Sequence, residues 1–94
     1  IIVRKQKEDI IMMKFERTLE DGQYEIWRST NHADPKQFAE ITLDWDNEYG
    51  NMYTAAVVTV TEGGYESFLY IGDYETKEEA VRHLECDFAT NGYF

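Results

Sequence analysis

The chain has 94 residues, of which 43% are hydrophobic and 15% aromatic, enough for the core of one small domain. Its single cysteine excludes an intramolecular disulfide framework and favours a reducing, cytoplasmic setting. No apolar run approaches the ~20 residues of a membrane-spanning helix, so no membrane association is expected. We therefore expect one domain over residues 1–94, in which residues 1–9 form a loose N-terminal arm.

The net charge of −10 is confined to the second part of the chain. Residues 1–36 hold seven Lys or Arg and seven Asp or Glu, whereas residues 37–94 hold two and twelve. Such a negative field repels nucleic acid and anionic membranes and attracts basic surfaces. The expected partner is therefore a basic protein surface, with no direct contact to nucleic acid. A plainer interpretation is that the acidity serves solubility alone.

The first predicted hairpin turns at Asp21-Gly22. Apolar and polar residues alternate over residues 11–19, which predicts a half-buried strand. Asp-Gly is a strong signal for a two-residue hairpin turn, and residues 23–29 would form the returning strand. The register of this turn places six residues on one face: Phe15, Arg17, Leu19, Tyr24, Ile26 and Arg28.

The most regular alternation of the chain covers residues 38–46 and predicts a third strand. A helix over residues 35–43 is the competing interpretation, which the alternation disfavours. One face of the strand would carry Ala39, Ile41, Leu43 and Trp45. The other would carry Glu40, Thr42, Asp44 and Asp46.

A second hairpin is predicted around Gly63-Gly64. Residues 52–61 are the most β-like run of the chain and are apolar at both parities, as in an interior strand. A two-residue turn at the glycines would pair Val58 with Leu69 and gather the aliphatic side chains on one face. The opposite face would be aromatic, with Tyr53, Phe68 and Tyr70.

A C-terminal helix is predicted from its start and stop signals. Thr76 and Glu79 form a capping box, and the helix would end at Asn91. Its apolar stripe consists of Ala80, Val81, Leu84 and Phe88. The expected fold is therefore α+β: an antiparallel sheet of about five strands with two tight hairpins, and one C-terminal helix packed on the face of Val58 and Leu69.

No catalytic or cofactor motif is present. The sequence lacks a glycine-rich phosphate loop, a paired-histidine metal motif and a CxxC pair. His83 shares one predicted helix face with Glu79 and Asp87, and Cys86 is three residues away. A structural zinc site requires four ligands, usually from two elements, and two of these are weakly binding carboxylates. We therefore expect no enzymatic activity, no cofactor and no metal site.

The remaining functional signal is the display of carboxylates on the second part of the chain. On one strand face they recur at multiples of ~7 Å, a spacing that suits imitation of a phosphate backbone. The expected function is a non-catalytic, acidic protein-interaction module. Its sharpest form is a phage or mobile-element inhibitor that mimics DNA and blocks a basic nucleic-acid-binding surface. The expected partner-binding residues are Glu40, Asp44, Asp46, Glu48, Glu62, Glu66, Asp73 and Glu75.

The alternative is a small structural or regulatory homo-oligomer. In this hypothesis the aromatic face of Tyr53, Phe68 and Tyr70 pairs between subunits, because aromatic side chains dominate the energetics of interfaces. The carboxylates would then contribute only to solubility.

Overall fold

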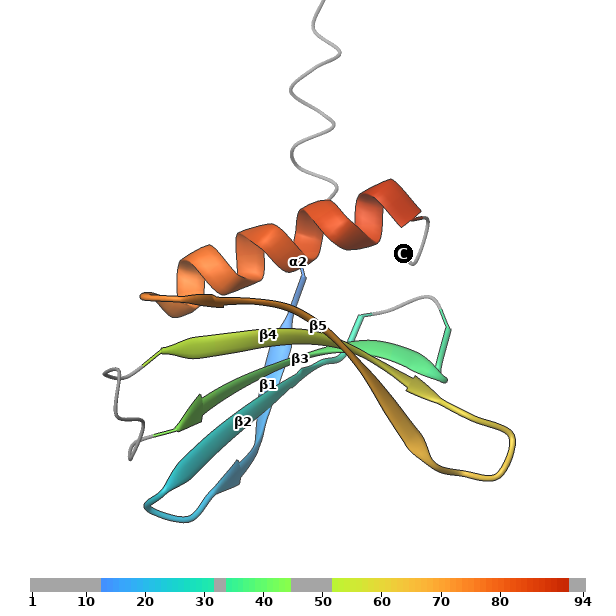
Figure 1. The fold of residues 1–94 in the computed structure, drawn as a ribbon, viewed down its shortest axis with the longest axis horizontal. Helices are drawn as coiled ribbons and strands as arrows, with labels where there is room; N and C mark the ends of the chain where they lie inside the picture. The colour runs from blue at the N-terminus through green and yellow to red at the C-terminus, as the bar shows by residue number, and fades with distance from the viewer. Residues whose placement is uncertain (1–12, 32–33, 45–51, 92–94) are drawn as a thin grey trace, which may run out of the picture.

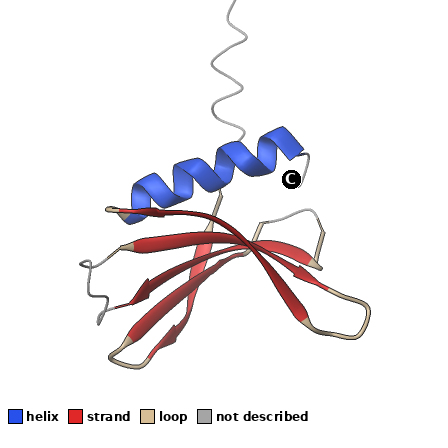
Figure 2. Cartoon of the chain, in the orientation of Figure 1, coloured by secondary structure: helices blue, strands red, loops and turns tan. Residues whose placement is uncertain are grey.

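The computed structural model describes residues 13–31, 34–44 and 52–91. These residues form β1 (Phe15–Glu20), β2 (Tyr24–Ser29), β3 (Gln37–Asp44), β4 (Tyr53–Val60), β5 (Glu66–Tyr74) and helix α2 (Lys77–Asn91). The strands form one antiparallel sheet in the order β1-β2-β3-β4-β5. Helix α2 lies across one face of this sheet (Figure 1) (Figure 2). The predicted α+β fold is therefore confirmed.

The alternation in the third predicted strand identifies β3 correctly. Its odd-numbered residues Ala39, Ile41 and Leu43 are buried towards the helix, and the competing helix over residues 35–43 is wrong. The expected N-terminal arm, residues 1–9, lies outside the described residues. Among the residues that the structure describes, no helix is long and apolar enough to cross a membrane.

Helix α2 begins where the capping box predicts. The Thr76 hydroxyl accepts a hydrogen bond from the N–H of Glu79 at 3.1 Å. This bond satisfies one of the N–H groups that the first helical turn leaves without an intrahelical partner. The helix ends at Asn91, as expected.

The core lies between α2 and one face of the sheet, which we call the helix face. Ala80, Leu84 and Phe88 are fully buried there. They pack with Met13, Ala39, Ile41, Ala55 and Val57. Helix α2 therefore covers the face that carries Val57, and the prediction that it covers the face of Val58 is wrong.

That error follows from the turn at the second hairpin, which has three loop residues instead of two. The N–H of Thr61 donates to the carbonyl of Tyr65 at 2.8 Å, and Gly64 has a φ of 87°. A type I turn followed by a residue at positive φ is the usual three-residue loop. It shifts the register by one, so that Val58 pairs with Phe68 rather than with Leu69. A one-residue shift moves every side chain of the strand to the other face.

The first hairpin is also displaced from its predicted register. Its turn is centred on Gly22 and Gln23, and the Asp21 carboxylate accepts hydrogen bonds from the N–H groups of Gln23 and Tyr24. These bonds lower the pKa of Asp21, and the bond from Tyr24 has the largest effect. A bulge between Arg17 and Leu19 then reverses the alternation. The six residues predicted to share one face are therefore divided between both faces.

The second face of the sheet, which we call the open face, carries no other element of the described chain. In Figure 1 the turns of the hairpins β1–β2 and β4–β5 point away from the helix, one to the lower left and one to the lower right. The strand residues on this face follow from the pairing. They are Glu16, Leu19, Tyr24, Ile26, Arg28, Phe38, Glu40, Thr42, Asp44, Thr54, Ala56, Val58, Val60, Glu66, Phe68, Tyr70 and Asp73.

Candidate functional site

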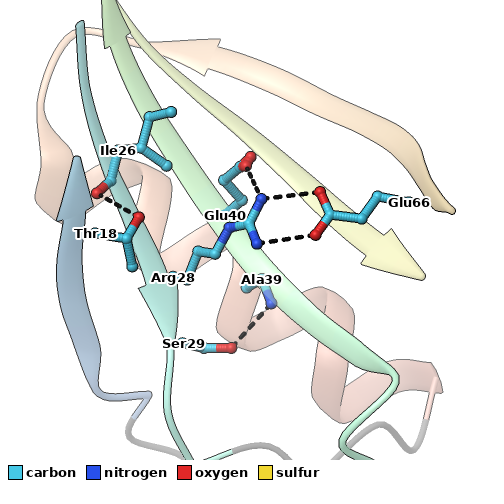
Figure 3. A network of polar contacts seen from close by, with 7 residues as sticks. All are labelled: Thr18, Ile26, Arg28, Ser29, Ala39, Glu40 and Glu66. Carbon is cyan, nitrogen blue, oxygen red and sulfur yellow. Dashed lines mark hydrogen bonds and ion pairs between the residues drawn. The ribbon is translucent and has the colours of Figure 1, made fainter. Parts of the chain in front are cut away.

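The centre of the open face is an arginine held by two carboxylates. Arg28 of β2 donates two hydrogen bonds to Glu66 of β5, both at 3.0 Å, and one to Glu40 of β3 at 3.4 Å (Figure 3). Its guanidinium also lies 4.9 Å from the centre of the Phe38 ring. The forked geometry of arginine allows this simultaneous contact with both carboxylates. We call these three charged residues the Arg28 clamp.

The Arg28 clamp spans two intervening strands, β3 and β4. At ~4.8 Å between neighbouring strands, the backbones of β2 and β5 lie about 14 Å apart in a flat sheet. The side chains of Arg28 and Glu66 therefore extend across the middle of the open face. On this face Phe38, in contact with the Arg28 guanidinium, and Val58 are only 9% and 0% exposed, although no helix of the described chain covers this side. The guanidinium of Arg28 thus covers part of the Phe38 ring on this face.

Burial and hydrogen bonding shift the pKa values of two clamp residues. Glu40 is 6% exposed, and burial raises its pKa, although the positive charge of Arg28 opposes the shift. The hydrogen bond with Glu66 is the main reason that the pKa of Arg28 is raised. The arrangement therefore ties three strands together by charge.

Exposed apolar side chains also lie on the open face, near both edges of the sheet. Leu19 and Tyr24 are 41% and 37% exposed near one hairpin tip, and Phe68 and Tyr70 are 55% and 60% exposed on β5. A hydrogen bond to the carboxylate of Asp73 raises the pKa of Tyr70. Four of the six large hydrophobic residues that are exposed in the described chain lie on this one face.

The structure separates the predicted partner-binding carboxylates into groups. Asp44 and Asp73 lie on the open face, where Asp73 accepts a hydrogen bond from Thr54 at 2.7 Å. Glu62 and Glu75 are exposed beyond the two ends of β5. Glu66 is partly exposed but engaged in the clamp. Asp46 and Glu48, which were also predicted to bind the partner, lie outside the described residues.

Two sequence-based assignments need correction. Glu40 is buried and bonded to Arg28, so it is not displayed to a partner in this structure. Tyr53 does not share a face with Phe68 and Tyr70. It lies on the helix face, with its ring centre 6.1 Å from that of Trp27.

Arg28 is the site residue that the sequence did not reveal. Its pairing with Glu66 joins positions 38 residues apart and depends on the register of both hairpins. A usable signal was available, because residues 37–76 contain no Lys or Arg and therefore offer no nearer cation to the strand carboxylates.

Helix α2 offers no comparable cluster. The His83 ring stacks on Tyr74 at 4.5 Å, and Cys86 is exposed. Among the residues with a described placement, no three His, Cys, Asp or Glu side chains gather as metal ligands. A mainly apolar pocket of about 350 Å³ lies beside the helix, next to Met13. It is lined by Met13, Lys77, Glu78, Val81, Arg82 and Glu85.

Comparison of the chain with protein-family models, with curated proteins and with solved structures finds no match. The functional argument therefore depends on the open face itself.

Proposed function

We propose that the protein is a non-catalytic interaction module whose open face binds a basic surface of a partner protein. The observation that carries this proposal is the combination of charge and apolar exposure on that face. Its strand residues include five carboxylates and one cation, and the cation, Arg28, is held by two of the five. The five carboxylates are Glu16, Glu40, Asp44, Glu66 and Asp73.

The two components of the face have different roles in binding. Exposed ion pairs contribute only about 0.2–1 kcal/mol each, and salt screens them. Complementary charge mainly accelerates association and selects the partner. Buried aromatic anchors contribute more, typically about 2 kcal/mol or more for a central residue. Phe68 and Tyr70 would therefore hold a partner that the carboxylates attract.

The sharpest form of the proposal is an inhibitor, of the kind a phage or mobile element uses, that occupies a nucleic-acid-binding surface as a DNA mimic. It is supported by the net charge of −10 and by the displayed carboxylates of the open face. The burial of Glu40 leaves Glu16, Asp44, Glu66 and Asp73 as the described strand carboxylates of the open face for this role. Displacement of DNA or RNA from the captured partner would distinguish this form from a general acidic module.

A homo-oligomer is the second candidate, and the exposure of Phe68 and Tyr70 favours it. The charge opposes it, because two copies would bring faces of the same sign together.

The proposal is tested with two charge-reversal variants of equal charge. Asp44→Lys/Asp73→Lys alters the open face, and Glu20→Lys/Glu78→Lys alters the opposite side of the molecule. Each replacement adds two units, so both variants have a net charge of −6 instead of −10. The native partner is captured from the cell of origin by cross-linking, and its affinity for each variant is measured at several salt concentrations.

We expect the open-face variant to lose at least tenfold in affinity and the control variant to lose less than threefold. Binding that does not weaken with salt, or that weakens equally in both variants, would contradict the proposal.

A further inference from the structure

Strand β5 is an edge of the sheet, and its backbone orientation can be deduced from two hydrogen bonds. The N–H of Val60 donates to the carbonyl of Lys36 at 2.8 Å, so the backbone of Val60 faces away from β5. The N–H of the next residue, Thr61, donates to Tyr65 at 2.8 Å and faces β5. Hydrogen-bonded and non-hydrogen-bonded pairs alternate along an antiparallel ladder.

This alternation assigns the inner and outer backbone groups of β5. Ser67 and Leu69 pair with Thr59 and Val57 and direct their N–H and C=O groups at β4. The intervening residues direct theirs outward, where no strand of the described chain pairs with them. These outward residues are Glu66, Phe68 and Tyr70.

The same outward residues carry the exposed aromatic side chains of the open face. Phe68 and Tyr70 are 55% and 60% exposed, and Leu69, on the other face, is 59% exposed. A strand added to this edge would therefore find free backbone groups and apolar side chains on both faces. An accessible, regular, apolar edge of this kind is a template for strand addition.

The other edge of the sheet is protected. β1 has six residues, is interrupted by the bulge between Arg17 and Leu19, and carries three charged side chains. β5 has nine residues and contains no Lys, Arg or Pro. Charges and bulges are the usual features that prevent strand addition at an edge. β5 has a bulge at Ile71, but over Glu66–Tyr70 its pairing is regular and its one charged side chain is Glu66.

The charge around β5 specifies the chemistry of the added strand. Residues 62–76 contain four carboxylates and no Lys or Arg. Glu62 and Glu66 lie at one end, where Glu66 is already paired with Arg28, and Asp73 and Glu75 lie at the other, with the apolar residues between them. From Glu66 to Asp73 the strand extends about 24 Å. A complementary segment is extended, apolar in its centre and basic at both ends.

We propose that the partner adds such a segment to the outer edge of β5 as a sixth strand. This inference rests on the proposed function and identifies the part of the partner that the protein binds. Backbone N–H and C=O groups of the segment bond to those of the three outward residues, and its central side chains pack against Phe68 and Tyr70. A second copy is a poorer occupant, because both copies carry a net charge of −10.

The test uses a synthetic peptide that alternates valine and threonine between a Lys-Arg pair at each end. Affinity is measured by calorimetry, and amide hydrogen exchange by NMR. In the free protein we expect fast exchange at the amides of Glu66, Phe68 and Tyr70 and slow exchange at Ser67 and Leu69. With the peptide bound, the first three become protected at least tenfold.

Two controls isolate the backbone pairing. A peptide of the same sequence, N-methylated at alternate residues on the edge that faces β5, keeps its charge and is expected to bind at least tenfold more weakly. In the protein, Phe68→Pro removes an outward N–H without removing a bond to β4, and Phe68→Ala removes only the ring. We expect Phe68→Pro to bind at least tenfold more weakly than Phe68→Ala. If Phe68→Pro does not fold, the N-methylated peptide decides.

The outcomes separate this inference from the proposed function. Equal binding of both peptides, with affinity that still falls with salt and on Asp44→Lys/Asp73→Lys, overturns strand addition and leaves the basic partner in place. Affinity that depends on neither salt nor these carboxylates overturns both. Protection of the three amides by self-association in the absence of peptide, measured together with light scattering, assigns the edge to a second copy and also overturns the inference.

Discussion

Arg28 donates to Glu40 and Glu66 from a strand that has no other cation on the open face. Removing it would leave the 6% exposed Glu40 carboxylate without its charged partner. We expect Arg28→Ala to lower the free energy of unfolding by about 1–3 kcal/mol, the usual cost of a buried polar group without a partner.

The double variant Arg28→Ala/Glu40→Gln removes the unpaired charge as well and should be more stable than Arg28→Ala alone. Chemical denaturation of the four members of this cycle measures the coupling. Strictly additive effects would show that the two residues do not stabilise one another.

The pH dependence of Glu40 has a definite sign. Burial raises the pKa of Glu40 above its ordinary value of 4.5, so the folded state binds this proton more tightly than the unfolded state. Ionisation of Glu40 therefore costs stability as the pH rises from 4.5 through the raised pKa. Glu40→Gln lacks this penalty.

We expect the free energy of unfolding of Glu40→Gln, relative to the wild type, to increase across that pH interval and to be constant below it. Thermal unfolding of both proteins between pH 3.5 and 7.5, at intervals of about half a pH unit, provides the measurement. A relative stability that falls as the pH rises would mean that Arg28 outweighs burial at this site.

At the level of the elements, Gly63 and Gly64 are not equivalent, although they are neighbours in one turn. Gly64 has a φ of 87°, which L-residues adopt at a cost, whereas Gly63 has no positive φ. A Cβ at Gly63 would meet the ring of Tyr65 at 3.0 Å, and Tyr65 is 76% exposed, so its side chain can move away. We expect Gly64→Ala to cost about 1–2 kcal/mol and Gly63→Ala clearly less. Denaturation midpoints of the two variants test this, and equal losses would favour the two-residue turn.

The same turn shows what the sequence could and could not predict. Period-two alternation identified β3, and the Thr76 cap identified α2, because both signals are local. The sequence Glu62-Gly63-Gly64 is compatible with either a two-residue or a three-residue loop, and only the pairing of distant residues decides between them. The bulge between Ala55 and Ala56 has no local signal either.

These register effects determined how much of the site was predictable. The acidic character of the surface follows from composition and was available from the sequence. The burial of Glu40, its bond to Arg28 and the position of Tyr53 on the helix face depend on which side chains share a face. A one-residue shift reverses that assignment for a whole strand.

For the molecule as a whole, the two faces of the sheet differ in what covers them and in their charge. Helix α2 buries the helix face with Ala80, Leu84 and Phe88, so this surface is occupied by the protein's own core. The open face retains its aromatic side chains, an excess of carboxylates and the free outer edge of β5. The two hypotheses for this face, a basic partner and a second copy, predict opposite responses to salt.

Salt weakens attraction between opposite charges and repulsion between like charges. If the open face binds a basic partner, raising the salt from about 0.05 M to about 0.5 M, where the Debye length falls from about 14 Å to about 4 Å, should weaken the complex at least tenfold. If it joins two copies, each with a net charge of −10, the same change should strengthen association. Sedimentation of the protein alone, and calorimetry with the basic peptide, measure the two effects under identical conditions. We expect a monomer at both salt concentrations and peptide binding that is at least tenfold weaker at the higher one. A dimer that forms at high salt and is abolished by Phe68→Ala/Tyr70→Ala would instead establish the aromatic side chains of the open face as a contact between copies.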